Sequence, residues 1–287
     1  MPEMPEVQGL TAFLAERAVG RTVAHTSVGA IAALKTYDPP NTALHGAEIT
    51  AATRRGKFIV LSFGDELHLV FHLAKAGWLR WYETLPATLI KPGKSPIALR
   101  VGLDDESGFD LTEAGSKKSL AVYVVRDPEQ VPGISRLGPD PLDPAFTREV
   151  FGGLLTGRRT QIKGLLRDQA VIAGIGNAYS DEILHAARMS PYAIADKLDG
   201  EEVDRLYAAM QTTLTEAVEE ASGKPPSDLK DAKRRGMQVH ARRGETCPIC
   251  GDTVRSVFFA DRSMEYCATC QTGGKVLADR RLSRLLK

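Results

Sequence analysis

The stretch CPICGDTVRSVFFADRSMEYCATC, residues 247–270, contains every cysteine of this 287-residue chain. The cysteines form two Cys-x2-Cys pairs, Cys247 with Cys250 and Cys267 with Cys270, separated by 16 residues. This spacing is typical of a zinc ribbon, in which two knuckles present four thiolates to one tetrahedral Zn²⁺ ion. Two disulfides would use the same residues, but a reducing cytoplasm disfavours them. We therefore predict one structural zinc ion in the C-terminal part of the chain.

The residues between the two cysteine pairs predict a β-hairpin whose ends the metal holds together. The apolar run VRSVFF is followed by the polar turn ADRS, and MEYC then leads back to the second pair. Arg262 falls at the tip of this hairpin. The hairpin alone leaves two interpretations open, a rigidly presented cation and an ordinary surface charge.

The formal charge of +1 at pH 7 conceals an uneven distribution of charged residues. From Lys230 to the end there are 13 Lys and Arg and 6 Asp and Glu. The first 229 residues contain 24 Lys and Arg and 30 Asp and Glu. A basic module on a mildly acidic body is expected of a part that meets phosphate, and a merely solvated face would look the same. No apolar run approaches the roughly 18 residues of a membrane span, and no secretory signal is visible, so we expect a cytoplasmic protein.

The first half of the chain alternates short apolar runs with turns. The runs KFIVLSF, LHLVFHLA, WLRWY and LAVYVV are rich in β-branched and aromatic residues, and each predicts a strand. Ahead of them, Val7, Leu10, Phe13 and Leu14 recur near helical spacing within residues 5–17. We therefore predict an N-terminal helix packed against a β-rich domain.

The pattern becomes helical after the turn-rich segment GPDPLDP, residues 138–144. In QAVIAGIGNAYSDEIL, Gly174 and Gly176 bracket a tight turn, and Asn177 is placed to cap the helix that follows. The N–H groups of a helix start can bind phosphate, although most helical hairpins never contact DNA. The chain thus reads as an α+β multidomain protein, with a β-rich domain over 1–137, a helical domain over 138–235 and the zinc finger with a basic tail over 236–287.

The opening residues MPEMPEV allow a specific chemistry if Met1 is removed. A second-position proline permits that removal, so we expect the mature chain to begin at Pro2, with a free secondary amine. Because α-amino groups titrate near roughly 7.7 to 8.0, part of this amine is nucleophilic at cellular pH. Its iminium with an aldehyde-like carbon cannot shed charge at nitrogen and can drive elimination, and Glu3 is placed to move protons. The alternative is that these residues have no function, since chain termini are usually poorly ordered and free to vary in sequence.

Five segments together resemble the formamidopyrimidine-DNA glycosylase and endonuclease VIII family. MPEMPEV resembles the family's PELPEV opening, and its later motifs are matched in order by RRGKFIVL, QIKGLLRDQAVIAGIGNAYSDEIL, VHARRGETCPICG and DRSMEYCATCQ. The resemblance runs from Pro2 to Gln271. It implies a β-sandwich with a flanking helix, a helix-two-turn-helix (H2TH) domain and a zinc-ribbon finger, in a monomeric base-excision repair enzyme that acts on damaged duplex DNA at the bacterial nucleoid.

The resemblance also implies roles for individual residues. Pro2 would attack C1′ of the damaged nucleotide, release the base and cleave the strand by β- and δ-elimination. Glu3 would be the general acid/base, and Glu6 would support the site and the sugar. Lys57 would belong to the catalytic group and grip phosphate. The remaining positions that match DNA-binding residues of the family are His72, Lys163, Asn177 and Arg262.

Three segments depart from the pattern of the 8-oxoguanine enzymes of this family. HLAKAG places Lys75 where those enzymes have methionine, and GSKKSL places Lys118 and Ser119 where they carry an arginine and phenylalanine wedge. The later VYGR-like motif is altered to His240-Ala241-Arg242. We therefore expect a lesion specificity other than 8-oxoguanine, with oxidised pyrimidines, bulky or alkylated bases and abasic sites all open.

Two other functions remain to be weighed against the glycosylase. A non-catalytic binder of damaged or distorted DNA could keep the same fold, but it has little need for a secondary amine at its terminus. A proline-based tautomerase would use that amine, but it does not account for the zinc ribbon or the chain length. The basic end TGGKVLADRRLSRLLK can be read as a phosphate-binding tail or a solubilising one.

Overall fold

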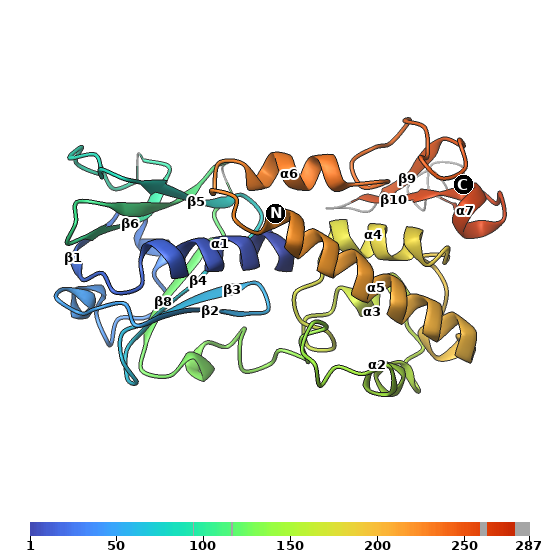
Figure 1. Ribbon diagram of the computed structural model, residues 1–287, viewed down its shortest axis with the longest axis horizontal. Coiled ribbons are helices and arrows are strands. Elements are labelled where there is room, and N and C mark those ends of the chain that lie inside the picture. Colours follow the sequence, from blue (N-terminus) through green and yellow to red (C-terminus); the bar gives the residue numbers. More distant parts are fainter. Residues whose placement is uncertain (94, 116, 259–262, 279–287) are drawn as a thin grey trace, which may run out of the picture. The chain divides into compact units, whose positions relative to one another are not determined.

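The computed structural model describes residues 1–93, 95–115, 117–258 and 263–278 (Figure 1). The chain forms two compact units. Unit 1 contains Met1–Leu137 and Glu220–Ala232, and unit 2 contains Gly138–Glu219 and Lys233–Lys287. The three-domain division remains a prediction, and each unit is described in turn.

Unit 1 is built on two four-stranded sheets, with strand orders β1-β6-β7-β5 and β2-β3-β4-β8. Every pair of neighbouring strands in them is antiparallel. Fully buried side chains from both sheets, including Leu61, Phe71, Phe109 and Leu111, share one hydrophobic core. This confirms the predicted β-sandwich. The strands are β1 (Val23–Val28), β2 (Ala51–Arg55), β3 (Phe58–Ser62), β4 (His68–His72), β5 (Gly77–Tyr82), β6 (Ile97–Leu103), β7 (Gly108–Glu113) and β8 (Ala121–Val125).

Helix α1 (Met4–Arg17) confirms the predicted N-terminal helix and packs on this sandwich. Val7, Leu10 and Leu14 lie in the core of unit 1. Gly9 permits a close approach to the end of helix α5 (Gly200–Ala221), since a Cβ built on it would stand 3.0 Å from the Ala221 carbonyl oxygen. Any larger residue at position 9 would push α1 away from its neighbours.

Four strands of unit 1 were not predicted from the sequence: β1, β2, β6 and β7. The middle of β1 is polar, with His25, Thr26 and Ser27, and the other three strands contain charged residues or glycines that interrupt apolar alternation. In β6 and β7 the charges are paired, because Arg100 and Asp110 are register partners. The Arg100 guanidinium donates two hydrogen bonds, of 2.7 and 2.8 Å, to the Asp110 carboxylate. A buried bidentate pair of this kind lets polar residues occupy a sheet interior.

Unit 2 contains most of the helical part of the chain, as predicted. A tight turn between α3 and α4 is braced by Gln169, whose amide accepts the Gly174 N–H and donates to the Ile175 carbonyl. Gly174 has φ +91°, a conformation that favours glycine. The helices from α2 onward are α2 (Arg148–Leu155), α3 (Ile162–Leu166), α4 (Asn177–Ala186), α5 (Gly200–Ala221) and α6 (Leu229–Gly236), the last two of which extend into unit 1.

The predicted hairpin is also present in unit 2. Strands β9 (Val254–Phe258) and β10 (Ser263–Cys267) pair antiparallel, and α7 (Ala268–Thr272) follows them. The tip of the hairpin, which holds Arg262, and the basic end from residue 279 lie outside the described residues. Their predicted roles remain predictions.

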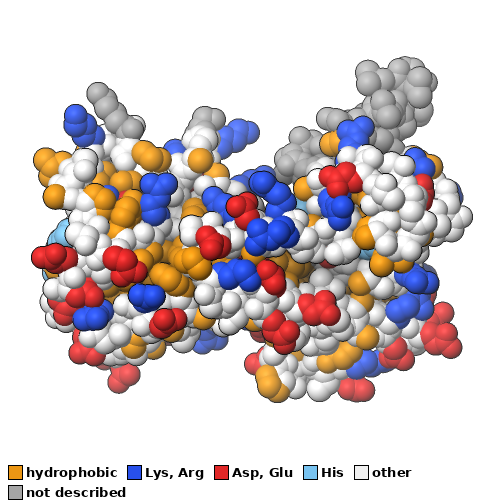
Figure 2. Space-filling model, turned by 45° about the horizontal axis from the view of Figure 1, so that its top comes forward, with side chains coloured by type: hydrophobic (Ala, Val, Ile, Leu, Met, Phe, Trp, Pro, Cys, Tyr) orange, Lys and Arg blue, Asp and Glu red, His pale blue; other side chains and the backbone are white. Residues whose placement is uncertain are grey.

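The surface carries charges of both signs. On the face drawn in Figure 2, Lys and Arg side chains alternate with Asp and Glu, and apolar side chains are scattered between them. Across the described residues, no helix combines the length and the apolar character that a membrane span requires. The cytoplasmic location remains a prediction.

Candidate functional site

In unit 1, Pro2, Glu3 and Glu6 form a buried cluster at the start of α1. All three are buried, and each glutamate is only 2 % exposed. Glu3 is the N-cap, and its carboxylate accepts the Glu6 backbone N–H while the Glu6 carboxylate accepts the Glu3 N–H at 2.8 Å. This reciprocal capping box satisfies two helix-end donors and fixes both carboxylates beside Pro2. It holds two acids next to the chain terminus with little freedom to move.

Lys57 and His72 form a second pair in unit 1. Lys57 follows Gly56, which turns the chain between β2 and β3 with φ +55°, and its side chain is buried. His72 ends β4 and accepts the Ala74 N–H on Nδ1 at 3.1 Å. Burial, with a smaller contribution from the Lys57 charge, lowers the pKa of His72 to about 4. His72 is therefore neutral at physiological pH, with its proton on Nε2, where it can donate a hydrogen bond.

The segment predicted to replace the family's wedge is folded around Glu113 at the end of β7. The Glu113 carboxylate, which is 3 % exposed as a residue, accepts the backbone N–H groups of Ser119 and Leu120 at 2.7 and 3.0 Å. The Lys118 ammonium donates to the Glu113 carbonyl at 2.5 Å. This loop therefore presents polar side chains and is held by a buried acid.

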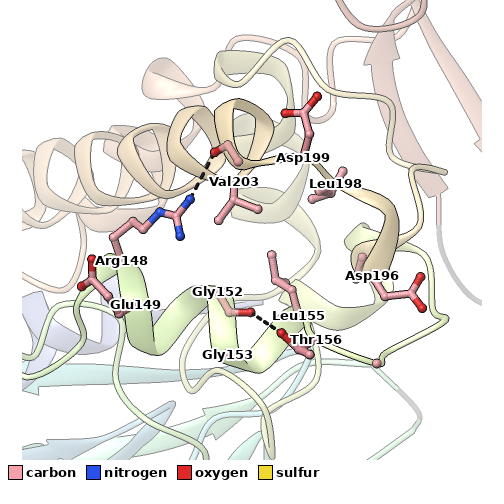
Figure 3. Close-up of a pocket in the computed structure, with 13 residues that line it drawn as sticks. Arg148, Glu149, Gly152, Gly153, Leu155, Thr156, Asp196, Leu198, Asp199 and Val203 are labelled. Atoms are coloured by element: carbon pink, nitrogen blue, oxygen red, sulfur yellow. Dashed lines mark hydrogen bonds between the residues drawn. The ribbon is translucent and has the colours of Figure 1, made fainter.

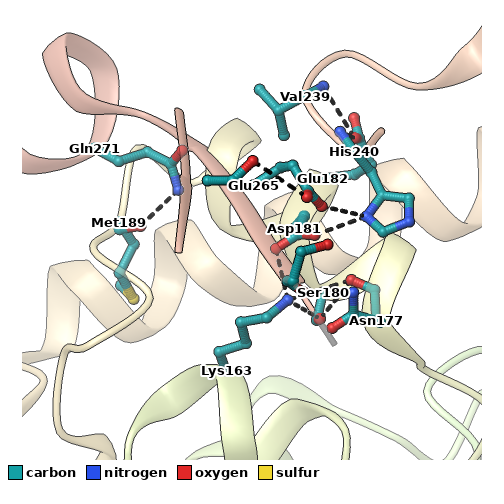
Figure 4. Close-up of polar contacts among 12 residues, drawn as sticks. Lys163, Asn177, Ser180, Asp181, Glu182, Met189, Val239, His240, Glu265 and Gln271 are labelled. Carbon is teal, nitrogen blue, oxygen red and sulfur yellow. Dashed lines mark hydrogen bonds and ion pairs between the residues drawn. The ribbon is translucent and has the colours of Figure 1, made fainter. Parts of the chain in front are cut away.

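In unit 2, Lys163 and Asn177 meet at the turn between α3 and α4 (Figure 4). The buried Lys163 ammonium donates to the Asp181 carboxylate at 2.6 Å, the Ser180 hydroxyl at 2.8 Å and the Asn177 carbonyl at 3.2 Å. The Asn177 side-chain amide donates to the Ser263 carbonyl at 2.8 Å. Asn177 does not cap α4 as predicted, because Gly176 occupies the cap position and no side chain caps the helix.

A buried chain of alternating charges extends from Lys163 across α4 to the hairpin. His240 Nδ1 lies 2.8 Å from the Asp181 carboxylate and 3.1 Å from that of Glu265 on β10. Burial lowers the pKa of His240, but hydrogen bonds to these two acids outweigh that effect and raise the pKa to about 9. Burial raises the pKa of Asp181, but its two cationic donors oppose that change, and we assign it as the carboxylate. The charges then alternate along the chain of contacts: Lys163 is positive, Asp181 negative, His240 positive and Glu265 negative.

The four cysteines gather at the base of the hairpin. Their sulfur atoms all lie within 4.8 Å of one another, as four ligands of one tetrahedral metal ion do. Burial raises the pKa of Cys267 to about 11 and also raises that of Cys270, so these two thiols need a bound cation to be held as thiolates at neutral pH. His185 Nε2 on α4 lies 3.3 Å from the Cys247 sulfur and can donate to it as an outer hydrogen bond. The residues fit one Zn²⁺ ion.

Three family models match successive parts of the chain. The formamidopyrimidine-DNA glycosylase N-terminal domain matches residues 1–118, its H2TH domain matches residues 137–226, and the zinc finger found in FPG and IleRS matches residues 244–273. A formamidopyrimidine-DNA glycosylase of Symbiobacterium thermophilum is 34 % identical over 281 residues, which cover 94 % of this chain and 89 % of the relative. The chain belongs to the formamidopyrimidine-DNA glycosylase family. It is a DNA-repair glycosylase of that type.

Two further similarities extend this assignment. A Mycobacterium tuberculosis protein named an uncharacterized formamidopyrimidine-DNA glycosylase-like protein is 57 % identical over 151 residues, which cover 53 % of this chain and 94 % of the relative. The solved complex of Lactococcus lactis Fpg (MutM) with DNA containing N7-benzyl-Fapy-dG has a TM-score of 0.83 and 25 % identity, and covers 94 % of this chain and all of that one.

Within this glycosylase fold, the predicted site residues fall into separate groups. Unit 1 brings Pro2, Glu3 and Glu6 together at the start of one helix. It also places Lys57 near enough to His72 for the lysine charge to lower the pKa of the histidine. Unit 2 joins Lys163 to Asn177 and gathers the four cysteines.

Sequence reasoning missed the function of four polar residues of this glycosylase: Asp181, Glu182, His240 and Glu265. Each side chain is at least half-buried. Each forms a hydrogen bond or ion pair with a residue more than 15 positions away along the chain. One signal was available, since Glu265 stands between the apolar Met264 and Tyr266 in the predicted hairpin. A buried acid in a short hairpin requires a cationic partner.

An open cavity of about 470 Å³ lies elsewhere in unit 2, between α2 and the start of α5 (Figure 3). The Arg148 guanidinium crosses it to donate to the Gly200 carbonyl at 3.2 Å. Three acids, Glu149, Asp196 and Asp199, line its wall, and none of the predicted site residues does. A surface with an excess of acids repels phosphate.

Proposed function

We propose that the chain, once processed to begin at Pro2, excises a damaged base and then cleaves the DNA strand at the resulting abasic site. The Pro2 nitrogen attacks C1′, the bond from C1′ to the base breaks, and the base leaves as it takes up a proton. The added amine loses its proton, O4′ takes up a proton, and the sugar ring opens to give an iminium between Pro2 and C1′. Loss of a C2′ proton then expels the 3′ phosphate, and a second elimination, with loss of a C4′ proton, expels the 5′ phosphate. Water then hydrolyses the iminium and frees Pro2.

Glu3 and Glu6 divide the proton transfers and the positioning of the sugar. Glu3 is adjacent to Pro2 in the chain, so its carboxylate can give and take protons at the reacting sugar. Glu6 accepts the Glu3 N–H at 2.8 Å and thereby fixes the backbone that carries the nucleophile. We assign Glu3 as general acid/base and Glu6 as a residue that supports the site and the sugar.

Lys57, His72, Asn177 and Arg262 are proposed to hold the DNA backbone around the damaged nucleotide. Lys57 supplies a charge, and the neutral His72 supplies one Nε2–H donor. Asn177 supplies a side-chain amide at the start of α4, where backbone N–H groups also favour a phosphate. For Lys163 we propose a structural part in the same site, because its ammonium already bonds to three groups of α4.

The lesion is proposed to be something other than 8-oxoguanine. An apolar wedge normally fills the space that a flipped base leaves. Here the matching segment carries Lys118 and Ser119 and is tied to Glu113, which leaves no apolar side chain at these two positions. Lys75 stands where a methionine would fill the same space. Damaged bases that pair weakly, and abasic sites, need the least help in leaving the stack.

One observation carries the proposal: the residue at position 2 is a buried proline flanked by two buried carboxylates locked in a capping box, in a chain of this glycosylase family. A non-catalytic binder has little need for a secondary amine at its terminus. Burying the two carboxylates costs stability unless they are bonded as they are here.

Borohydride trapping on a duplex with one abasic site tests the proposal. Protein sequenced to begin at Pro2 should form a covalent adduct, and a chain extended at its N-terminus, in which the Pro2 nitrogen is an amide, should form none. Glu3→Gln should slow base release and strand cleavage. Glu16→Gln, at an exposed acid of the same helix, is the matched control and should behave as wild type. Tight binding without any adduct from the processed chain would instead support a non-catalytic binder.

A further inference from the structure

The segment KRRGMQVHARR, residues 233–243, concentrates positive charge in unit 2. It contains five Lys and Arg residues and no acid. We call these five residues the basic strip: Lys233, Arg234, Arg235, Arg242 and Arg243. The strip begins in the last turn of α6 and continues toward the zinc-binding thiols.

The backbone under the basic strip is firmly anchored. The buried Glu182 carboxylate of α4 accepts three consecutive backbone N–H groups, those of Gln238, Val239 and His240, at 2.7, 3.1 and 2.7 Å. The Val239 side chain is fully buried. Because the backbone is held by a charged acceptor and a buried side chain, the strip presents its charges from a fixed surface and not from a loose tail.

Aromatic rings contact two cations of the strip. Lys233 Nζ lies 4.7 Å from the centre of the Tyr179 ring, and the Arg243 guanidinium lies 4.9 Å from that of Phe258. A cation over an aromatic face keeps its charge. Arg234 and Arg235 are exposed, and neither has an acidic partner among the residues that the structure describes. In contrast, Arg242 is paired with Glu245 at 2.7 Å.

The strip adjoins the start of α4. Tyr179, under Lys233, is two residues from Asn177 in the first turn of that helix. The Lys163 ammonium, which also lies at this turn, is occupied by Asp181, Ser180 and the Asn177 carbonyl. The strip therefore supplies outward-facing charge close to a helix start where phosphate is expected.

We propose that the basic strip is an additional phosphate-binding surface, on which Arg234 and Arg235 contact the DNA backbone next to the site that Asn177 marks. The contacts are independent of sequence and of damage, since they go to phosphate oxygens and not to bases. This inference rests on the proposed function only in taking DNA as the ligand. Binding to undamaged duplex tests it without any chemistry.

A structural role makes a different prediction. Lys and Arg in the last turn of a helix also stabilise it by opposing the helix dipole. If that were the whole role of Arg234 and Arg235, removing them would lower stability slightly and leave the salt dependence of DNA binding unchanged. If they bind phosphate, each lost contact lowers the salt slope by about 0.9.

The experiment measures the affinity of zinc-loaded, full-length protein for a fluorescent duplex, undamaged or with one abasic site, at several salt concentrations. In Arg234→Ala/Arg235→Ala the slope should fall by about 1.8, so that the loss of affinity between about 50 and about 200 mM salt becomes about twelvefold smaller. The slope should fall equally on both duplexes. Arg234→Lys/Arg235→Lys should keep the wild-type slope, because a point charge suffices for phosphate.

Arg158→Ala/Arg159→Ala is the matched control. It removes the same charge from two exposed arginines of unit 2, one of which lies 3.7 Å from Asp196 on the wall of the acidic cavity. Its slope should equal that of wild type. An unchanged slope in the Arg234/Arg235 variant, or an equal fall in the control, would overturn the proposal. Failure of borohydride trapping would bear on the proposed chemistry alone and leave this result standing.

Discussion

Replacing His240 with asparagine should destabilise unit 2 by an amount that depends on pH. Asparagine keeps a donor near the position of Nδ1 but cannot carry a charge, so Asp181 and Glu265 lose the cation between them. The side chain of His240 is 23 % exposed and those of the two acids are 1 % and 6 % exposed, so solvent replaces little of the lost interaction. The pH dependence should isolate the contribution of the charge.

The magnitude follows from the pKa of His240, which rises from 6.5 to about 9 on folding. Protonation therefore favours the folded state, by about 3 kcal/mol when the whole shift is counted. This stability is fully present below pH 6.5, where the unfolded chain is protonated too, and is lost as pH rises through about 9. The difference between wild type and His240→Asn should thus be about 3 kcal/mol near pH 6 and close to zero above about pH 9.5.

Urea unfolding of the zinc-loaded proteins, followed by the helical circular dichroism signal, measures this difference across the pH range. Zinc content is determined at each pH, so that loss of metal is not mistaken for loss of the ion pairs. A stability difference that stays constant from about pH 6 to about pH 9.5 would refute the reasoning, because it would mean that His240 acts through packing and not through charge.

Two other perturbations test the structural assignments. Removal of zinc by a chelator should unfold the β9–β10 hairpin and abolish tight DNA binding, whereas re-addition of Zn²⁺ should restore both; a metal-free chain that keeps its hairpin signals in NMR spectra would contradict the structural role. Asp110→Asn should cost about 3 to 5 kcal/mol by leaving the Arg100 guanidinium buried without its carboxylate, and a loss below about 1 kcal/mol in urea unfolding would show that the pair is dispensable.

The sequence by itself determined those features that depend on spacing along the chain. Cys-x2-Cys pairs 16 residues apart predicted the thiol site, because a knuckle brings two ligands together through local geometry. Pro2 and Glu3 predicted reactive chemistry at the start of the chain, which remains a prediction, and the spacing of three between Glu3 and Glu6 is the one a capping box needs. Strands with β-branched runs, such as β3 and β4, were predicted for the same local reason.

Elements whose polar residues find partners far away along the chain could not be predicted in this way. Strands β6 and β7 contain Arg100 and Asp110, which look like surface residues until the register places them opposite each other. Glycines such as Gly102 and Gly108 in the same strands further weakened the pattern. A propensity argument counts such residues against a strand, whereas the folded sheet accommodates them as a pair.

Only the tertiary structure decided the polar centre of unit 2. Lys163, Asp181, His240 and Glu265 come from two helices, one loop and one strand, and no spacing rule links positions 163 and 265. Each is costly to bury alone and is stabilised only when all four charges alternate. A buried charge depends on what surrounds it in space, whereas a sequence pattern records only what lies next to it in the chain.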